Sequence, residues 1–121
     1  NDTYGHLAGD ESLRAVAAQV DGLFNRPSDV VARYGGEEFV VVLPYVNAEN
    51  AAAKAEQVRS HIEKLAITAD GHKLKLTLSI GWVSIVPRDG MTSRLLIACA
   101  DRALYEAKAA GRNRVVAGEM S

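Results

Sequence analysis

The residues with the clearest capacity for chemistry lie in one short run, RYGGEEF at residues 33–39. Two adjacent carboxylates, Glu37 and Glu38, follow two glycines there, and the apolar residues 40–43 come next. Neighbouring negative charges repel each other, so such a pair is costly unless a cation neutralises it. Glycines also let a phosphorylated ligand and its Mg²⁺ approach the backbone closely. The run therefore indicates either a site for a metal-bound phosphate or, more plainly, a hairpin tip with two solvated acids.

Two further polar blocks flank this run, NDTYGHLAGD at residues 1–10 and ADRALYEAKAAGRN at residues 100–113. In this order and spacing, the three blocks resemble the GGDEF family of diguanylate cyclases, and the resemblance covers nearly the whole chain. It implies a reaction that joins two GTP molecules into cyclic di-GMP and releases two pyrophosphates. Each 3′-hydroxyl would attack the α-phosphate of the other GTP, which requires metal ions, a base and a grip on guanine.

By this resemblance the first catalytic candidate is Glu37, as a ligand of Mg²⁺ (or Mn²⁺) and as the base. Glu38 is the second catalytic candidate. Successive strand side chains point to opposite faces, so the two carboxylates need not share a role, and Glu38 has a solvated or structural role as its alternative. Gly35 and Gly36 are expected to lie against the bound GTP.

The first block supplies the expected guanine contacts. Asn1 and Asp10 match guanine-binding positions of the family, and His6 lies in the same block. A carboxylate can accept hydrogen bonds from both donor groups on the Watson–Crick edge of guanine, and an amide can both donate and accept. The plainer alternatives are a helix N-cap for Asp10 and a turn-stabilising histidine for His6.

The last block supplies the expected phosphate contacts. Lys108 and Arg112 are four residues apart, so we expect them to share one helix face. The resemblance implies that both contact the GTP phosphates. The plainer explanation is that cations near a helix C-terminus are favoured by the helix dipole.

Arg26 and Asp29 form an RxxD pattern that five residues separate from Gly35. The resemblance implies an inhibitory site for the product, cyclic di-GMP. An arginine can stack on guanine or chelate phosphate, and an aspartate can accept from guanine. An isolated RxxD is otherwise a surface ion pair. The family often adds an arginine on the next helix. This chain has Gln57 at that position, and Arg59 follows two residues later, so the sequence does not decide whether cyclic di-GMP binds there with high affinity.

Hydrophobic periodicity predicts the helices that must position these residues. They span about residues 10–24, 48–65 and 93–110. Asp10 and Asn47 are the expected N-caps, and Gly111 is the expected C-terminal stop.

The predicted strands span about residues 30–33, 38–43 and 114–116, with a further one in the seventies. The first two are joined by the Gly-Gly turn as a hairpin. In the seventies, Leu74, Leu76, Leu78 and Ile80 alternate strictly with polar residues, which indicates a strand with one buried face.

The predicted order is α–β–β–α–β–α–β, and its hairpin implies an α+β fold with an antiparallel-containing central sheet and flanking helices. The resemblance implies a palm-like nucleotidyl cyclase fold. It also implies a strand before residue 1 that supplies a metal-binding aspartate and a Phe-Lys pair. We therefore expect one N-terminally incomplete domain over residues 1–121, impaired in GTP turnover by itself even where its parent is active.

The composition fits a single globular domain with 24% charged residues and a net charge of −1. Such a charge excludes a general basic field for nucleic acid. The single cysteine, Cys99, excludes an internal disulfide and is expected to be a small buried core residue rather than a reactive thiol. No stretch approaches the roughly 20 apolar residues of a membrane span. We expect a cytoplasmic domain whose parent can be anchored in a membrane.

Since one such domain would hold one GTP, catalysis would need a homodimer of two domains, brought together by upstream sensory domains. The first alternative is a non-catalytic effector that binds cyclic di-GMP through Arg26 and Asp29. A further alternative is an α+β domain that serves only dimerisation.

Overall fold

A computed structural model describes residues 5–35, 37–65, 67–69 and 71–119. Its elements follow in the order α1 (Gly5–Leu23), β1 (Val30–Gly35), β2 (Glu38–Pro44), α2 (Ala48–Lys64), β3 (Ile67–Ala69), β4 (His72–Leu74), β5 (Ser79–Ile85), α3 (Ser93–Ala109) and β6 (Arg114–Ala117). Among the described helices, none combines the length and apolarity that a membrane span requires.

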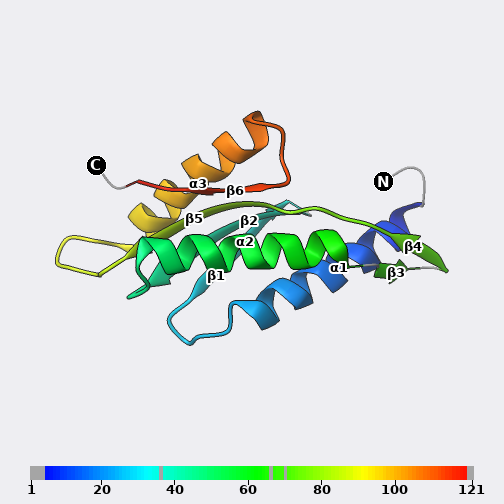
Figure 1. Ribbon diagram of the computed structural model, residues 1–121, viewed down its shortest axis with the longest axis horizontal. Coiled ribbons are helices and arrows are strands. Elements are labelled where there is room, and N and C mark those ends of the chain that lie inside the picture. The colour runs from blue at the N-terminus through cyan, green and yellow to red at the C-terminus, as the bar shows by residue number, and fades with distance from the viewer. Residues whose placement is uncertain (1–4, 36, 66, 70, 120–121) are drawn as a thin grey trace.

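The main sheet has the strand order β1-β2-β5-β6. β1 pairs with β2 in antiparallel fashion, whereas β2–β5 and β5–β6 are parallel pairs. Helix α3 covers one face of this sheet, and α1 and α2 cover the other (Figure 1). The structure thus confirms an α+β fold in which an antiparallel hairpin belongs to a larger, mixed sheet.

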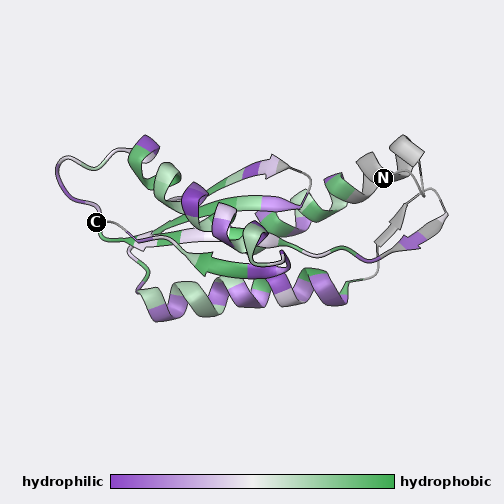
Figure 2. Cartoon of the chain, turned by 90° about the horizontal axis from the view of Figure 1, so that it is seen from above, coloured by the Kyte–Doolittle hydropathy of each residue, from purple (hydrophilic) through white to green (hydrophobic). Residues whose placement is uncertain are grey.

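Strand β2 builds a core on each face of the sheet by alternation of its side chains. Phe39 and Val41 pack on the side of α1 and α2, while Val40 and Val42 pack on the side of α3. Helix α2 contributes its small and branched residues to the first core, and hydrophilic and hydrophobic positions alternate along its ribbon (Figure 2). Asn47 caps this helix as predicted, since its side-chain oxygen accepts from Asn50 N at 2.7 Å.

Strand β5 lies at the centre of the sheet and packs closely against α3. A Cβ atom added at Gly81 would collide with the backbone of Ala100 and Leu104. The absence of a side chain at position 81 is therefore what lets α3 cross the central strand at this point.

One predicted strand is wrong. Residues 74–80 do not form a continuous strand: β4 ends at Leu74 in a small hairpin with β3, and β5 begins only at Ser79. Strand β5 has both faces covered and two parallel neighbours, so its buried residues are nearly continuous in sequence. The alternation that looked like a half-buried strand lies mostly in the segment leading to β5.

Candidate functional site

The described residues of the glycine-rich run, which exclude Gly36, lie where the antiparallel strands β1 and β2 meet, as predicted. Gly35 ends β1 opposite Glu38, which begins β2, and the register shifts between Arg33 and Gly35. The carbonyl oxygen of Glu37 accepts a hydrogen bond of 3.0 Å from Ser79 N. This bond ties the tip to the start of the central strand, so the position of the two carboxylates is set by the core of the sheet.

Glu38 is held between two cations. Lys108 Nζ lies 3.3 Å from its Oε1, and Arg112 Nη1 lies 2.7 Å from its Oε2. The hydrogen bond from Arg112 is the main cause that lowers the pKa of Glu38; burial opposes it, and Lys108 lowers the pKa further. Glu38 is therefore an ionised carboxylate at neutral pH, engaged by a cation on each oxygen.

The two cations reach Glu38 from different backbone conformations, which corrects the predicted common helix face. Lys108 lies in the last turn of α3, but α3 ends at Ala109 and Arg112 lies beyond it with a φ of 66°. Gly111, with a φ of 122°, is the predicted stop. The side chains of Lys108 and Arg112 still converge, because both pair with Glu38 rather than because helical spacing aligns them.

Glu37 is partly exposed at the same tip. Among the described residues, no group of three or more histidine, cysteine or acidic side chains could by itself hold a metal ion. Mg²⁺ is commonly bound through one or two carboxylates together with substrate phosphates. Glu37 fits the part of one such carboxylate, whereas both oxygens of Glu38 already face cations.

The expected guanine-binding residues lie mostly outside what the structure describes. Asn1 and Gly36 are outside the described residues, and so are the side chains of His6 and Asp10. The backbone does correct one prediction, because α1 begins at Gly5 and Asp10 lies inside the helix. Asp10 is therefore not an N-cap; residues 5–9, with two glycines, are helical despite their weak helix propensity.

Arg26 and Asp29 form the predicted close pair. Arg26 Nη2 lies 2.7 Å from Asp29 Oδ1, and Arg26 Nε donates to the same oxygen at 2.9 Å. Arg26 Nη2 also donates to the carbonyl oxygen of Pro44 at 2.7 Å. The Asp29 side chain is only 5% exposed, against 42% for Arg26. The arginine therefore presents its outer surface to solvent from a position fixed by the end of β2.

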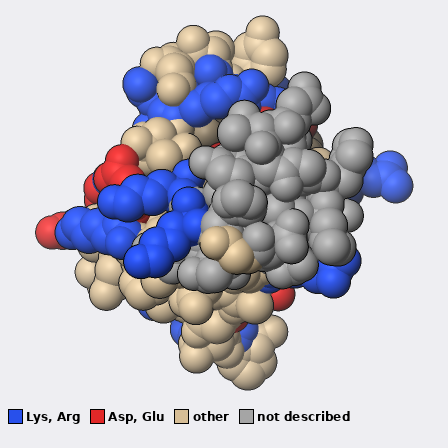
Figure 3. All heavy atoms as spheres, turned by 90° about the vertical axis from the view of Figure 1, so that its right-hand side faces the viewer, with Lys and Arg blue, Asp and Glu red and all other residues tan. Residues whose placement is uncertain are grey.

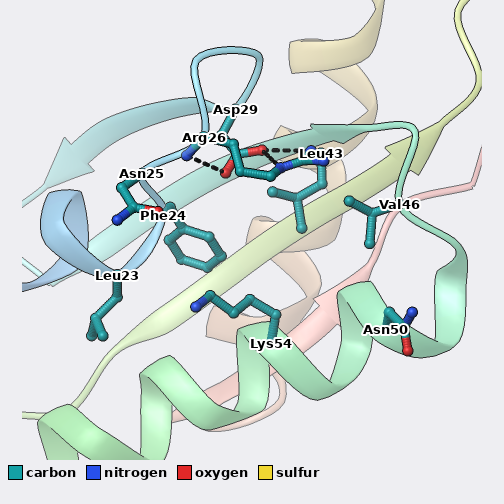
Figure 4. A pocket seen from close by; sticks show the side chains of 9 residues that line it. All are labelled: Leu23, Phe24, Asn25, Arg26, Asp29, Leu43, Val46, Asn50 and Lys54. Atoms are coloured by element: carbon teal, nitrogen blue, oxygen red, sulfur yellow. Dashed lines mark hydrogen bonds and ion pairs between the residues drawn. The ribbon is translucent and has the colours of Figure 1, made fainter.

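This pair lines a pocket of about 260 Å³ between the α1–β1 loop and α2 (Figure 4). Helix α2 contributes Asn50 and Lys54 to the lining, and Gln57 is absent from it. The Lys54 side chain extends from α2 on the side of the pocket opposite Arg26 and Asp29. Sequence reasoning missed this cation, although Lys54 lies one helical turn before the position where an arginine was expected.

Arg59 does not line this pocket. Its guanidinium makes a double hydrogen bond to Glu56, at 2.7 and 2.6 Å, and its side chain is 14% exposed. Arg59 therefore does not supply the second arginine that the family often places beside this pocket.

Lys and Arg side chains gather at the end of the molecule where α2 and α3 finish (Figure 3). Lys108 and Arg112 bring two positive charges to the hairpin tip through their ion pairs with Glu38. The local positive charge arises despite a net charge of −1 for the whole chain. Such a local concentration is what a polyphosphate would require of an otherwise near-neutral domain.

Three further residues of types that often take part in chemistry, Trp82, His61 and Cys99, lie outside this site. Trp82 is 5% exposed and packs in the core. His61 is exposed and shares a hydrogen bond with Gln19. Cys99 is half-buried rather than buried, and burial raises the pKa of its thiol, which disfavours the reactive thiolate.

Comparison with known proteins places these features in one family. Residues 1–114 match the family described as diguanylate cyclase, GGDEF domain. Diguanylate cyclase A of Treponema denticola is 47% identical over 115 residues, which are 95% of this chain and 30% of that protein. Diguanylate cyclase DosC of Escherichia coli K12 is 44% identical over 117 residues, 95% of this chain and 25% of that protein.

Solved structures agree. The GGDEF domain of DgcB from Caulobacter crescentus in complex with c-di-GMP superimposes with a TM-score of 0.75 at 32% identity, over 97% of this chain and 68% of that one. The GGDEF domain of TpbB (or YfiN) from Pseudomonas aeruginosa gives 0.79 at 34% identity, over 98% and 69%. The chain spans less than a third of the length of the two curated relatives named above. It belongs to the GGDEF family.

Proposed function

We propose that this chain is the catalytic domain of a diguanylate cyclase, which condenses two GTP molecules into cyclic di-GMP and two pyrophosphates. The observation that carries the proposal is the convergence of Lys108 and Arg112 on Glu38, at a hairpin tip that also presents Glu37. Two cations held at a glycine-rich tip beside a second, separate carboxylate make a surface suited to a metal-bound triphosphate.

In this proposal Lys108 and Arg112 bind the GTP phosphates. Their present partner, Glu38, carries one negative charge shared between two cations, so a triphosphate of higher charge can compete for them. Glu38 keeps the two cations in place before the substrate arrives. The pairing of Glu38 with both cations supports a structural role for Glu38, and a direct role of Glu38 in catalysis is the second possibility.

Glu37 is proposed as the metal ligand and as the base that accepts the proton of the attacking 3′-hydroxyl. Diguanylate cyclases are nucleotidyl cyclases that generally use a divalent metal, and we propose Mg²⁺ or Mn²⁺ here. When bound, the metal would neutralise part of the charge on the phosphates. The guanine contacts are proposed for Asn1, His6 and Asp10 on the family resemblance alone.

Because one domain would hold one GTP, the proposed active species is a dimer in which two hairpin tips face each other. Product release would then require the dimer to open, and a site elsewhere on the domain could regulate that step. The pocket beside Arg26 and Asp29 is our proposal for such a site, with cyclic di-GMP as its ligand. Support comes from the charged rim of this pocket and from the DgcB structure, which is a complex with c-di-GMP.

The experiment is to measure cyclic di-GMP formed from GTP and Mg²⁺ by the full-length natural protein, beside its Glu37→Ala variant. We expect product from the natural protein and none above background from the variant, with equal thermal melting of both. Product from a folded Glu37→Ala variant would remove Glu37 from its proposed role.

The alternative function is a module that binds cyclic di-GMP without making it, and the Arg26–Asp29 pocket is the observation that favours it. A folded natural protein that makes no product but binds cyclic di-GMP in a calorimeter would establish this alternative. Loss of that binding in Arg26→Ala would place the ligand in the pocket.

A further inference from the structure

The chain leaves α3 through a tightly bonded turn. The amide of Gly111 donates to the carbonyl oxygen of Lys108 at 3.2 Å, and the amide of Arg112 donates to that of Ala107 at 2.9 Å. This is the pattern of a Schellman motif, in which the residue after the helix cap adopts a positive φ. Gly111 meets that demand with a φ of 122°. An added side chain there would also press on the guanidinium of Arg114.

Two further residues with positive φ follow this glycine. Arg112 has a φ of 66° and Asn113 a φ of 47°. For residues other than glycine this left-handed conformation is unfavourable, because the Cβ atom approaches the following carbonyl oxygen, and asparagine tolerates it best. Two consecutive residues of this kind need compensating contacts, and the conformation decides where the Arg112 side chain points.

Helix α2 supplies those contacts through a closed ring of three side chains. Asn113 Oδ1 accepts from Arg59 Nη1 at 2.7 Å, and Asn113 Nδ2 donates to Glu63 Oε2 at 2.6 Å. Arg59 Nη1 also donates to Glu63 Oε1 at 3.3 Å, which closes the ring. Both polar atoms of the Asn113 amide are therefore engaged, and the amide can adopt only one orientation.

The ring is firmly supported on α2. Arg59 is anchored by its double hydrogen bond to Glu56, which is the main cause that raises the pKa of the guanidinium. The hydrogen bond from Asn113 is the main cause that lowers the pKa of Glu63, followed by that from Arg59. The charged forms of Arg59 and Glu63 are therefore favoured, and the amide of Asn113 bridges these two opposite charges.

We propose that Arg59, Glu63 and Asn113 are positioning residues, which fix the left-handed segment 111–113 and thereby aim the Arg112 guanidinium at the hairpin tip. They need no contact with substrate: their effect passes through the backbone between Asn113 and Arg112. That Arg112 binds phosphate rests on the proposed function, but its placement beside Glu38 does not.

The decisive variant is Asn113→Gly, because glycine keeps the left-handed backbone at no steric cost and removes only the amide. Glu63→Ala breaks the same ring from the exposed side of α2. Lys64→Gln, at an exposed position beside it, is the matched control. The first readout needs no enzymatic activity: the titration of the Glu38 carboxyl carbon by NMR in the full chain.

We expect the pKa of Glu38 to rise in Asn113→Gly and Glu63→Ala, because Arg112 is no longer held beside it, and to stay unchanged in Lys64→Gln. An unchanged Glu38 titration in both ring variants, with native melting, would overturn the proposal. If the natural protein makes no cyclic di-GMP but the Glu38 titration shifts as expected, the positioning role stands and the proposed function fails.

The second readout is enzymatic. A charge-assisted hydrogen bond contributes enough that Arg112→Ala should raise the KM for GTP by about tenfold or more, and Asn113→Gly by about threefold to tenfold, with kcat changed less. In the Arg112→Ala background, Asn113→Gly should have no further effect on KM, since it acts through Arg112. Additive effects of the two substitutions would show that Asn113 acts by another route and would overturn the proposal.

Discussion

Arg112 Nη1 lies 2.7 Å from Glu38 Oε2, and this contact joins the turn after α3 to the first residue of β2 across 74 positions of sequence. The contact brings two motifs of the chain into one site. It also gives the carboxylate of Glu38 a partner that must be displaced, or shared, when a polyphosphate binds.

The contact predicts a pH dependence of stability. The pKa of Glu38 is lowered in the folded chain, mainly by Arg112, from an ordinary value of 4.5. The pair therefore stabilises the folded state above pH 4.5, and this contribution is lost as the pH falls through the lower pKa of the folded state. We expect Glu38→Gln to reduce the free energy of unfolding by about 1 kcal/mol or less at pH 7, as is usual for an accessible ion pair.

The measurement is urea unfolding of the natural chain and of the Glu38→Gln variant at pH 7 and at pH 3. The difference in free energy of unfolding between these two chains should shrink at the lower pH. Glu106→Gln on the exposed side of α3 is the matched control for the loss of one carboxylate elsewhere on the chain. A difference that is equal at both pH values would mean that the ion pair is not the source of the stability.

Much of this site could be predicted from sequence, and the reasons differ from one part to another. The hairpin follows from two apolar runs around Gly35 and Gly36, and the stop at Gly111 follows from helix-end chemistry; both are local signals. The two faces of β2 follow from alternation.

What could not be predicted depends on partners far along the chain. The hydrogen bonds of Asn113 with Arg59 and Glu63 join residues at least 50 positions apart, and no local sequence pattern predicts them. Arg112 lies next to Asn113 in the left-handed segment, so the prediction that Arg112 shares a helix face with Lys108 was wrong. The alternation around Leu76 wrongly predicted a strand through residues 74–80. The strand β5 begins only at Ser79, where its pairing with the distant strand β2 begins.

The second prediction concerns the packing of α3 on the sheet. Gly81→Ala should lower the free energy of unfolding by roughly 1–3 kcal/mol or more, because the added methyl group meets the rigid backbone of Ala100 and Leu104. Gly22→Ala is the matched control, since that helical glycine has no neighbouring atom within 4 Å. It should stabilise the chain by up to about 1 kcal/mol. Thermal melting of both variants measures the contrast, and a Gly81→Ala chain as stable as the natural one would show that α3 can move away freely.

The third prediction separates two residues of α2 at the Arg26 pocket. Lys54 lines the pocket and Gln57 does not. Lys54→Ala should weaken the binding of cyclic di-GMP by about tenfold, the effect of one charge-assisted hydrogen bond, while Gln57→Ala should leave it unchanged. Titration calorimetry with cyclic di-GMP measures both. A larger loss in Gln57→Ala than in Lys54→Ala would mean that the ligand approaches α2 elsewhere.

The last prediction concerns the metal. If Glu37 is its protein ligand and GTP phosphates supply the rest, metal binding should depend on nucleotide and on Glu37 together. In a thermal melt of the natural chain with a non-hydrolysable GTP analogue, Mg²⁺ should raise the Tm further than the analogue alone, and chelation should reverse this gain. In Glu37→Ala the analogue should still raise the Tm through Lys108 and Arg112, but the increment from Mg²⁺ should vanish. An equal Mg²⁺ increment in both chains would assign the metal to the nucleotide alone and leave Glu37 with the part of a base.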